Sequence, residues 1–398
     1  MITRQEIALT EYQTLELPQE SLSSALAEQL WRNYKAQVSI EYPTFITNWK
    51  WFLTNQGWVG YIPVSNELLI TLKPRVAIEN IFRMLEYAYN LRSMHFLREQ
   101  VQCESLQDFF NILAGILAKR ILTRAKKGFY KAYRDENERL AYVCGRIDMN
   151  QQLKSPWSPN LPCHYQDCTP DIADNQILLW TLYNIIRSGL CRDENLQLVH
   201  RAFRSVQKVA HMVPFTARQC TGRYYNRLNL DYQPMHNLCW FFLEHSGPQF
   251  ATGKQMMIPF MVNMPRLYEL FVAQWLKVNL PEEFELKCQE KVQINASIML
   301  YFNIDLVIYD KKTEEALYVL DTKYKIGDSV SPDDFAQIVT YALAKKCPEA
   351  VLVYPGEVGN QFSGYINNIR VRSLPFRVDY DIEEAGQEFV GELLKDYG

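Results

Sequence analysis

The chain has 398 residues, of which 48% are hydrophobic and 22% are charged, as in a globular protein of two or three domains, so a disordered chain is excluded. The net charge is −3, whereas a protein that holds nucleic acid tightly by itself is usually basic, so a DNA substrate would require a partner. The polar N-terminus shows no signal-peptide pattern, no apolar run reaches the roughly 18 residues of a membrane span, and the nine cysteines are scattered. We therefore expect a protein of the reducing cytoplasm without a membrane partner.

The predicted fold class is α+β and multidomain. Residues 1–75 are expected to form a β-rich N-terminal module, because short β-branched and aromatic runs alternate there with Asn, Gly, Pro and Ser. Pro74 ends this module. A helix is predicted directly after it from apolar residues near helical spacing, namely Ile78, Ile81, Phe82 and Leu85.

Residues 76–250 are expected to form a mainly helical region that binds a partner. Residues 106–127 predict an amphipathic helix with a basic C-terminal end, which suits the helix dipole. Residues 171–245 also have helical patterns. Between them, residues 128–147 predict a projecting β-hairpin, with two strands on either side of the charged turn Arg134–Arg139.

Residues 251–398 are expected to form a C-terminal α/β domain. A helix at 264–280 is followed by strands at 285–295, 299–310 and 315–325, a helix at 331–346 and a buried strand at 349–355. In the second and third of these strands, apolar runs meet carboxylates: Asp305 lies within Ile-Asp-Leu-Val-Ile, and Asp321 is followed by Thr322 and Lys323.

Asp305 and Asp321 are predicted to lie close together. Side chains two apart on a strand share a face, so Asp321 and Lys323 point the same way, and antiparallel pairing can bring Asp305 beside Asp321. Two close carboxylates repel, and a hard divalent cation such as Mg²⁺ removes that repulsion. Such an ion activates water and polarises a phosphoryl oxygen, while a neighbouring lysine offsets charge that develops on the phosphate.

Three further residues are candidates for the same site. Glu269 lies on the preceding helix and is expected as a third oxygen ligand or a proton acceptor. Gln337 and Tyr341 are four apart on the following helix and therefore share one face. The competing interpretation is that Asp305 and Asp321 merely end strands and that Lys323 is solvated.

Asp305, Asp321-Thr322-Lys323 and the preceding Glu269 helix together resemble the PD-(D/E)xK nuclease superfamily, although Ile304 stands in place of the Pro of that name. Gln337 and Tyr341 resemble the Q-x-x-x-Y element of its RecB-like branch. The resemblance implies a nuclease that uses Mg²⁺ and leaves open whether Mn²⁺ substitutes. It implies metal ligands at Asp305, Asp321, Thr322 and Glu269 and catalytic roles for Asp305, Asp321, Lys323, Glu269, Gln337 and Tyr341.

The chain from about residue 70 to 360 resembles the McrC family, the nuclease subunit of McrBC methylation-dependent restriction systems. The resemblance depends on residues 74–89, on the Gly145-Arg146-Ile147-Asp148 segment, on Asp171–Asn175 and on Arg223-Tyr224-Tyr225. It implies an antiviral endonuclease that cleaves double-stranded DNA together with a hexameric AAA+ GTPase, McrB. That partner recognises methylcytosine and binds the GTP, whereas this chain binds no nucleotide and has no P-loop sequence.

The resemblance also implies that a projecting segment enters the partner ring. We expect the charged run Arg134, Asp135, Glu136, Asn137, Glu138 and Arg139 to bind the partner, the alternative being a solvated surface hairpin. Arg146 either contacts the partner's nucleotide site or, as we favour, pairs with Asp148 or another carboxylate. Two alternative functions stay open: a non-catalytic assembly and GTPase-activating subunit, and a stand-alone RecB-like repair or defence nuclease.

Overall fold

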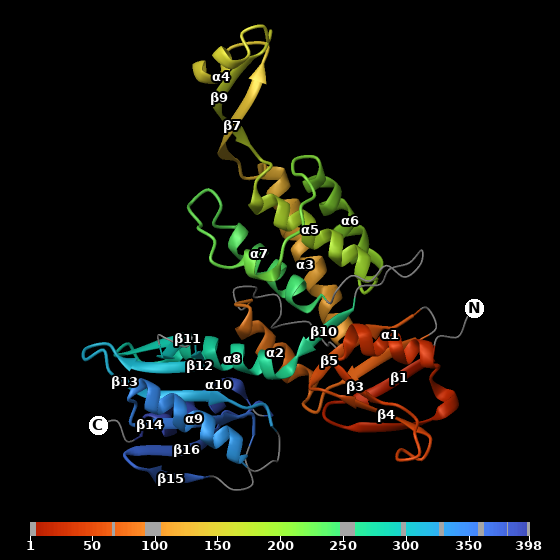
Figure 1. The fold of residues 1–398 in the computed structure, drawn as a ribbon, viewed down its shortest axis with the longest axis vertical. Coiled ribbons are helices and arrows are strands. Elements are labelled where there is room, and N and C mark those ends of the chain that lie inside the picture. Colours follow the sequence, from red (N-terminus) through yellow and green to blue (C-terminus); the bar gives the residue numbers. More distant parts are fainter. Residues whose placement is uncertain are drawn as a thin grey trace. The chain divides into compact units, whose positions relative to one another are not determined.

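The computed structural model describes residues 5–65, 68–91, 105–246, 259–295, 300–325, 330–356, 362–379 and 381–395. The chain divides into two compact units: unit 1 is Met1–Leu106 with Pro259–Gly398, and unit 2 is Gln107–Ile258. Figure 1 shows both units and labels most of their elements. The expected domain boundary at residues 250 and 251 lies outside the described residues.

Two small sheets and a helix form the N-terminal part of unit 1. The first sheet has the order β1 (Gln5–Thr10), β6 (Leu68–Lys73), β5 (Trp58–Pro63) and β10 (Phe260–Asn263), and the second has the order β2 (Thr14–Pro18), β4 (Lys50–Asn55) and β3 (Val38–Glu41). Helix α1 (Ser24–Tyr34) packs its Leu30 into a core shared with Trp51 and Ile70. The sequence analysis did not predict α1, which begins where the Ser23 hydroxyl accepts a hydrogen bond from the Leu26 amide.

A six-stranded mixed sheet forms the C-terminal part of unit 1. Its order is β11 (Phe284–Asn295), β12 (Leu300–Asp310), β13 (Ala316–Thr322), β14 (Glu349–Tyr354), β16 (Ile369–Pro375) and β15 (Ser363–Ile366). The first three strands pair antiparallel, and β13, β14 and β16 pair parallel.

Helices connect and cover this sheet. Helix α8 (Met264–Asn279) precedes it, α9 (Pro332–Lys345) links β13 to β14, α10 (Ile382–Leu393) follows β16, and α2 (Ile78–Ala88) comes from the N-terminal part of the chain. Ile338 on α9 belongs to one buried core with Val319 and Leu352 of the sheet. The predicted order of helix, three strands, helix and strand is confirmed by α8, β11, β12, β13, α9 and β14.

Unit 2 is built from four longer helices and a small sheet. The helices are α3 (Leu106–Lys127), α5 (Ala173–Ser188), α6 (Asp193–Gln207) and α7 (Tyr232–His245). Buried aromatic pairs such as Phe110 and Phe242, whose ring centroids lie 4.9 Å apart, join α3 to α7. The helices predicted at 106–127 and within 171–245 are therefore confirmed.

The small sheet of unit 2 corrects the predicted hairpin. Its order is β7 (Ala132–Leu140), β9 (Leu161–Thr169) and β8 (Arg146–Ile147), with the short helix α4 (Met149–Lys154) beside it, and it projects from the helices of unit 2 (Figure 1). The run Arg134–Arg139 is no turn but the interior of β7, whose partner is β9. The error has a physical reason: both faces of this narrow ribbon meet water, so a charged sequence is stable in a strand.

Among the described residues, no helix combines the length and the apolar character that crossing a membrane requires.

Candidate functional site

Asp305 and Asp321 come from neighbouring antiparallel strands. Leu306 of β12 pairs with Leu320 of β13, so the next step along this register sets Asp305 opposite Asp321. The Thr322 amide and hydroxyl donate to Asp305 Oδ2 over 3.4 and 3.5 Å. The structure thus brings together the two aspartates that the sequence analysis singled out, and Thr322 orients one of them.

Burial makes the negative charge of this pair unfavourable. Burial, followed by the charges of Asp321 and Glu269, raises the pKa of Asp305 to about 7. Asp321 is 2% exposed, and burial also raises its pKa, although the neighbouring Lys323 opposes the shift. Its buried Oδ2 accepts no hydrogen bond of good geometry. These carboxylates therefore favour a positively charged ligand, or a proton when no such ligand is bound.

Lys323 supplies one positive charge to the site. Its Nζ lies 2.8 Å from Asp321 Oδ2, donates to Gln337 Oε1 over 2.9 Å and lies 3.5 Å from Asp334 Oδ1. Burial alone would lower the pKa of Lys323, but Asp321 and Asp334 raise it, so the ammonium stays protonated. Gln337 in turn donates to the Tyr341 hydroxyl over 2.7 Å.

Asp334, in the first turn of α9, was missed by the sequence analysis. It contacts both Lys323 and Lys325. The Ser331 hydroxyl caps α9 by accepting a hydrogen bond from the Asp334 amide over 3.2 Å. The sequence signal that could have revealed Asp334 is the start of a helix at Pro332, soon after Asp321-Thr322-Lys323.

Glu269 reaches the site through an intermediary. Its Oε1 lies 2.7 Å from Arg266 Nη1 and accepts a hydrogen bond from the Gln289 amide, which also donates to Asp305 Oδ1 over 3.4 Å. The sequence analysis missed Gln289, since a strand residue in the middle of β11 carries no pattern that distinguishes it.

The chemistry of these donors fits a hard divalent cation. Within the described part of the chain, no three His, Cys, Asp or Glu side chains converge closely enough to form a metal shell by themselves. Mg²⁺ needs fewer, because it usually keeps several waters and binds through one or two carboxylates. Asp305 and Asp321 supply two carboxylates, and the buried Asp321 Oδ2 supplies an oxygen that lacks a well-formed hydrogen bond.

Another buried carboxylate links the N-terminal strands to the segment that follows β13. Glu11 is fully buried, and its Oε2 accepts hydrogen bonds from the Arg75 amide over 2.9 Å and from the Tyr324 hydroxyl over 3.4 Å. Burial raises the pKa of Glu11 to about 7. Because Tyr324 directly follows Lys323, this contact ties the β-rich part of unit 1 to the end of β13.

The projecting sheet of unit 2 carries a different kind of charge. Side chains of the run Arg134–Arg139 are mostly exposed and pair across the ribbon, Asp135 with Gln166 over 3.0 Å and Glu138 with Tyr165 over 3.3 Å. Gly145 makes the turn before β8 with φ of +67°, and a Cβ there would lie 2.3 Å from the His164 carbonyl oxygen. The surface is accessible for a partner, and the sequence prediction that it binds one stays a prediction.

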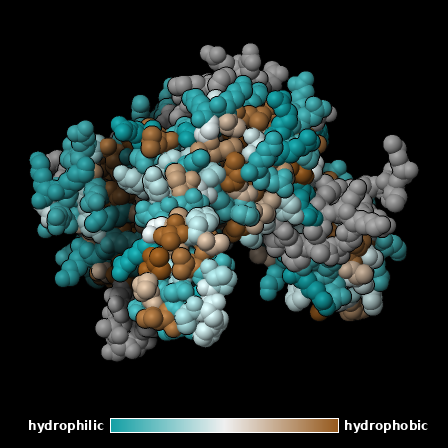
Figure 2. Space-filling model, turned by 90° about the horizontal axis from the view of Figure 1, so that it is seen from above, coloured by the Kyte–Doolittle hydropathy of each residue, from teal (hydrophilic) through white to brown (hydrophobic). Residues whose placement is uncertain are grey.

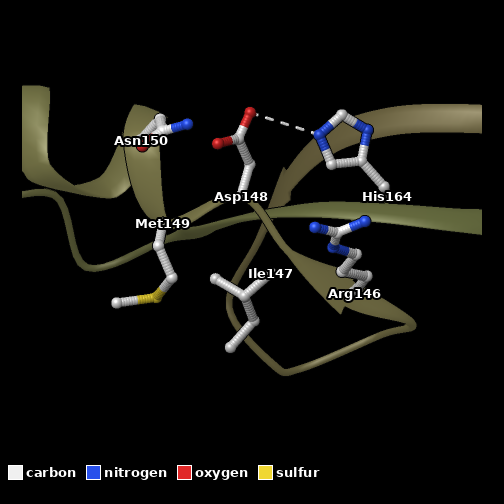
Figure 3. Close-up of a pocket in the computed structure, with 6 residues that line it drawn as sticks. All are labelled: Arg146, Ile147, Asp148, Met149, Asn150 and His164. Carbon is white, nitrogen blue, oxygen red and sulfur yellow. Dashed lines mark hydrogen bonds and ion pairs between the residues drawn. The ribbon is translucent and has the colours of Figure 1, made fainter.

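A pocket of about 520 Å³ opens beside β8, lined by Arg146, Ile147, Asp148, Met149, Asn150 and His164 (Figure 3). The expected pairing of Arg146 with Asp148 is wrong. Asp148 accepts a hydrogen bond from the Gln151 amide at the start of α4 and lies 3.2 Å from His164 Nε2. The Arg146 side chain forms no hydrogen bond or ion pair with any described residue, so its guanidinium is available to an anionic group.

Hydrophobic side chains are also exposed near this pocket. Figure 2, which views the molecule from above, shows hydrophobic patches within a mostly hydrophilic surface. Close to the pocket in sequence, Met149 is 60% exposed, Leu153 is 73% exposed and Trp157 is 81% exposed. Large exposed apolar side chains of this kind are typical of a protein-binding surface.

Comparison with known proteins identifies the chain as a component of a restriction system. The family model described as "McrBC 5-methylcytosine restriction system component" matches residues 53–355, which is more than half of the chain. The chain belongs to this McrBC family, and the resemblance to McrC is confirmed.

One solved structure supports the fold. A chain of the refined half-complex from a tetradecameric assembly of Thermococcus gammatolerans McrB AAA+ hexamers with bound McrC has a TM-score of 0.56 at 14% identity, covering 98% of this chain and 100% of that chain. A chain of the cryo-EM structure of the Thermococcus gammatolerans McrBC complex has a TM-score of 0.43 at 16% identity, covering 70% of this chain and 89% of that chain. No curated protein matches.

Proposed function

We propose that this chain is the DNA-cleaving subunit of a McrBC-like, modification-dependent restriction complex. In this proposal it is a Mg²⁺-dependent endonuclease of the PD-(D/E)xK type, and it binds and stimulates a hexameric AAA+ GTPase of the McrB type, which binds the GTP. The observation that carries the proposal is the convergence of Asp305, in the middle of β12, with Asp321 and Lys323 at the end of β13.

The residues of the site divide the work. Asp305 and Asp321 hold the cation, with Glu269 nearby, and the bound ion lowers the pKa of a water and polarises a phosphoryl oxygen. Lys323, protonated and oriented by Asp321 and Gln337, directs the attacking water and offsets the negative charge that develops on the phosphate. Tyr341 orients the Gln337 amide.

The partner is proposed on two grounds. The McrC of the structurally similar assembly is bound to McrB AAA+ hexamers, and unit 2 presents an exposed, charged ribbon at Arg134–Arg139. The net charge of −3 agrees with a division of labour in which the partner selects and grips the double-stranded DNA.

The test uses the chain together with a McrB-type GTPase and methylated DNA. Asp305→Asn and Asp321→Asn are expected to abolish cleavage while partner binding and GTPase stimulation persist. The matched control is Glu285→Gln, an exposed carboxylate of β11, which is expected to cleave like the wild type.

Three results would contradict the proposal. Cleavage that persists in both Asn variants removes the catalytic assignment. Wild-type protein that stimulates the GTPase but does not cut DNA, whichever divalent metal is added, is a non-catalytic assembly subunit. Efficient cutting without any GTPase indicates a stand-alone nuclease.

A further inference from the structure

Gln289 has an unusual backbone for its position. Among the described residues, eight non-glycine residues have a positive φ, and Gln289, at +52°, is the one that lies inside a strand rather than in a turn or at a helix end. L-residues avoid this region, and such strain is often found at functional sites, where the surrounding structure maintains it. The backbone of Gln289 therefore calls for an explanation at the level of its side chain.

The strand pairing sets Gln289 directly across from Asp305. Cys288 pairs with Leu306, and Glu290 pairs with Ile304, so Gln289 and Asp305 occupy the positions between these pairs. Glu290 points to the network of Lys345 and Tyr309. Successive strand residues point to opposite faces, so the side chain of Gln289 lies on the other face from that of Glu290, where it donates to Asp305.

The amide of Gln289 joins two carboxylates from different elements. Its Nε2 donates to Glu269 Oε1 on α8 and to Asp305 Oδ1 on β12, the second over 3.4 Å. Both acceptors are carboxylate oxygens, so the chemistry requires that the nitrogen, and not the oxygen, faces them. The nitrogen thus occupies a point that both carboxylates can reach, as a cation shared between them would.

We infer that Gln289 is a ligand of the metal site and also the residue that positions its third carboxylate. In the arrangement seen here, its amide nitrogen donates hydrogen bonds to both Glu269 and Asp305, while Arg266 forms a competing ion pair with Glu269. Rotation about the terminal bond of the side chain exchanges nitrogen for oxygen and presents a neutral oxygen to the cation, a ligand type that hard divalent ions accept. The inference rests on the proposed function, because it presupposes that Asp305 holds a cation.

Calorimetric titration of Mn²⁺ into the full chain, after treatment with a chelator and without DNA, tests this inference. Gln289→Leu removes both polar atoms and is expected to weaken Mn²⁺ binding by roughly 10- to 100-fold. Gln289→Glu keeps an oxygen and adds a charge, so it is expected to bind Mn²⁺ at least as tightly as the wild type. The control is Gln387→Leu, an exposed glutamine of α10, which is expected to bind like the wild type.

The Glu variant separates a ligand from a mere hydrogen-bond donor. A role as hydrogen-bond donor alone predicts that Gln289→Glu binds Mn²⁺ as poorly as Gln289→Leu, because a carboxylate at position 289 cannot donate and repels Glu269 and Asp305. That result overturns the inference. Unchanged binding by Gln289→Leu overturns it as well, and neither result affects the proposed nuclease. Wild-type protein that binds no Mn²⁺ overturns the metal site and this inference together. If Gln289→Leu does not fold, Gln289→Glu alone decides.

Discussion

Two regions of the molecule are rich in charge: the site formed by Asp305 of β12 with Asp321 and Lys323, and the projecting ribbon of unit 2. They differ in their access to water. In unit 1, burial raises the pKa of Asp305 to about 7. In unit 2, the pKa of Asp171, which directly follows the ribbon in sequence, is lowered to about 2. Burial alone would raise this pKa, but hydrogen bonds from His211 and Gln176 outweigh it. Hydrogen bonds that outweigh burial keep a carboxylate charged and stabilise the structure, whereas a carboxylate whose partners do not offset its burial is available for chemistry.

The largest effect is expected when the buried site loses the positive charge of Lys323. Lys323→Met should lower the single-turnover rate of DNA cleavage by about 10²- to 10³-fold, because it removes the charge that stabilises the transition state. Lys325→Met, whose ammonium contacts Asp334 but not Asp321, should have a much smaller effect. Equal losses in the two variants would show that charge near the site, not the position of Lys323, matters.

The next effect concerns pH and unfolding. The folded pKa of Glu11 is raised from 4.5 to about 7, so its contribution to stability is present below pH 4.5 and is lost as pH rises through 7. The loss is on the order of 2 to 3 kcal/mol for this fully buried group. Glu11→Gln should remove the part of the fall in unfolding free energy that comes from Glu11, measured by urea unfolding in the presence of a chelator. The part that comes from Asp305, whose folded pKa is also raised to about 7, should remain.

The comparison of the two units gives that experiment its control. Asp171 has a lowered pKa, so its contribution is present above pH 3.8 and is lost as pH falls to about 2. Asp171→Asn should therefore alter the unfolding free energy near neutral pH without changing how that free energy varies with pH between 4.5 and 7. A wild-type slope that Glu11→Gln leaves intact would contradict the assignment to Glu11.

A smaller effect is expected on the exposed surface of unit 2. Trp157→Ser should weaken binding of the GTPase by roughly tenfold, as for a single anchoring aromatic side chain. Tyr224→Ser is the matched control, since Tyr224 is also highly exposed, at 85%, and lies outside the ribbon. GTPase stimulation measured against chain concentration gives both affinities, and equal weakening would remove the assignment of the surface around the pocket.

The smallest effect is expected at the start of α9. Ser331→Ala removes the hydroxyl that accepts from the Asp334 amide, which should lower the unfolding free energy by about 1 kcal/mol. Cleavage should fall less than in Lys323→Met, because Asp334 and Gln337 still lie on α9, which the substitution leaves in place. Thermal unfolding and cleavage measured on one preparation check both parts, and an unchanged melting temperature would show that the cap contributes little.

Strand order and the main acidic site were predictable, whereas the local structure of the ribbon was not. Asp305 lies inside one apolar run of strand length and Asp321 at the end of the next, and a carboxylate in such a run is a local signal that the sequence shows directly. The run Arg134–Arg139 has the composition of a turn, and only its pairing with β9 makes it a strand. Helix α1 was missed for a similar reason, since β-rich neighbours surround it on both sides in the sequence.

The sequence by itself determined strands β11 to β14 of the C-terminal sheet, the family, and the Asp, Asp and Lys of the candidate site, because hydrophobic periodicity and rare buried charges are local signals; it did not predict β15 and β16. Only the tertiary structure decided which residues complete that site. Gln289, Asp334 and Glu11 act through partners 16 to 313 residues away or through a helix start. Such contacts depend on strand register and on backbone angles, which no local pattern of residues encodes.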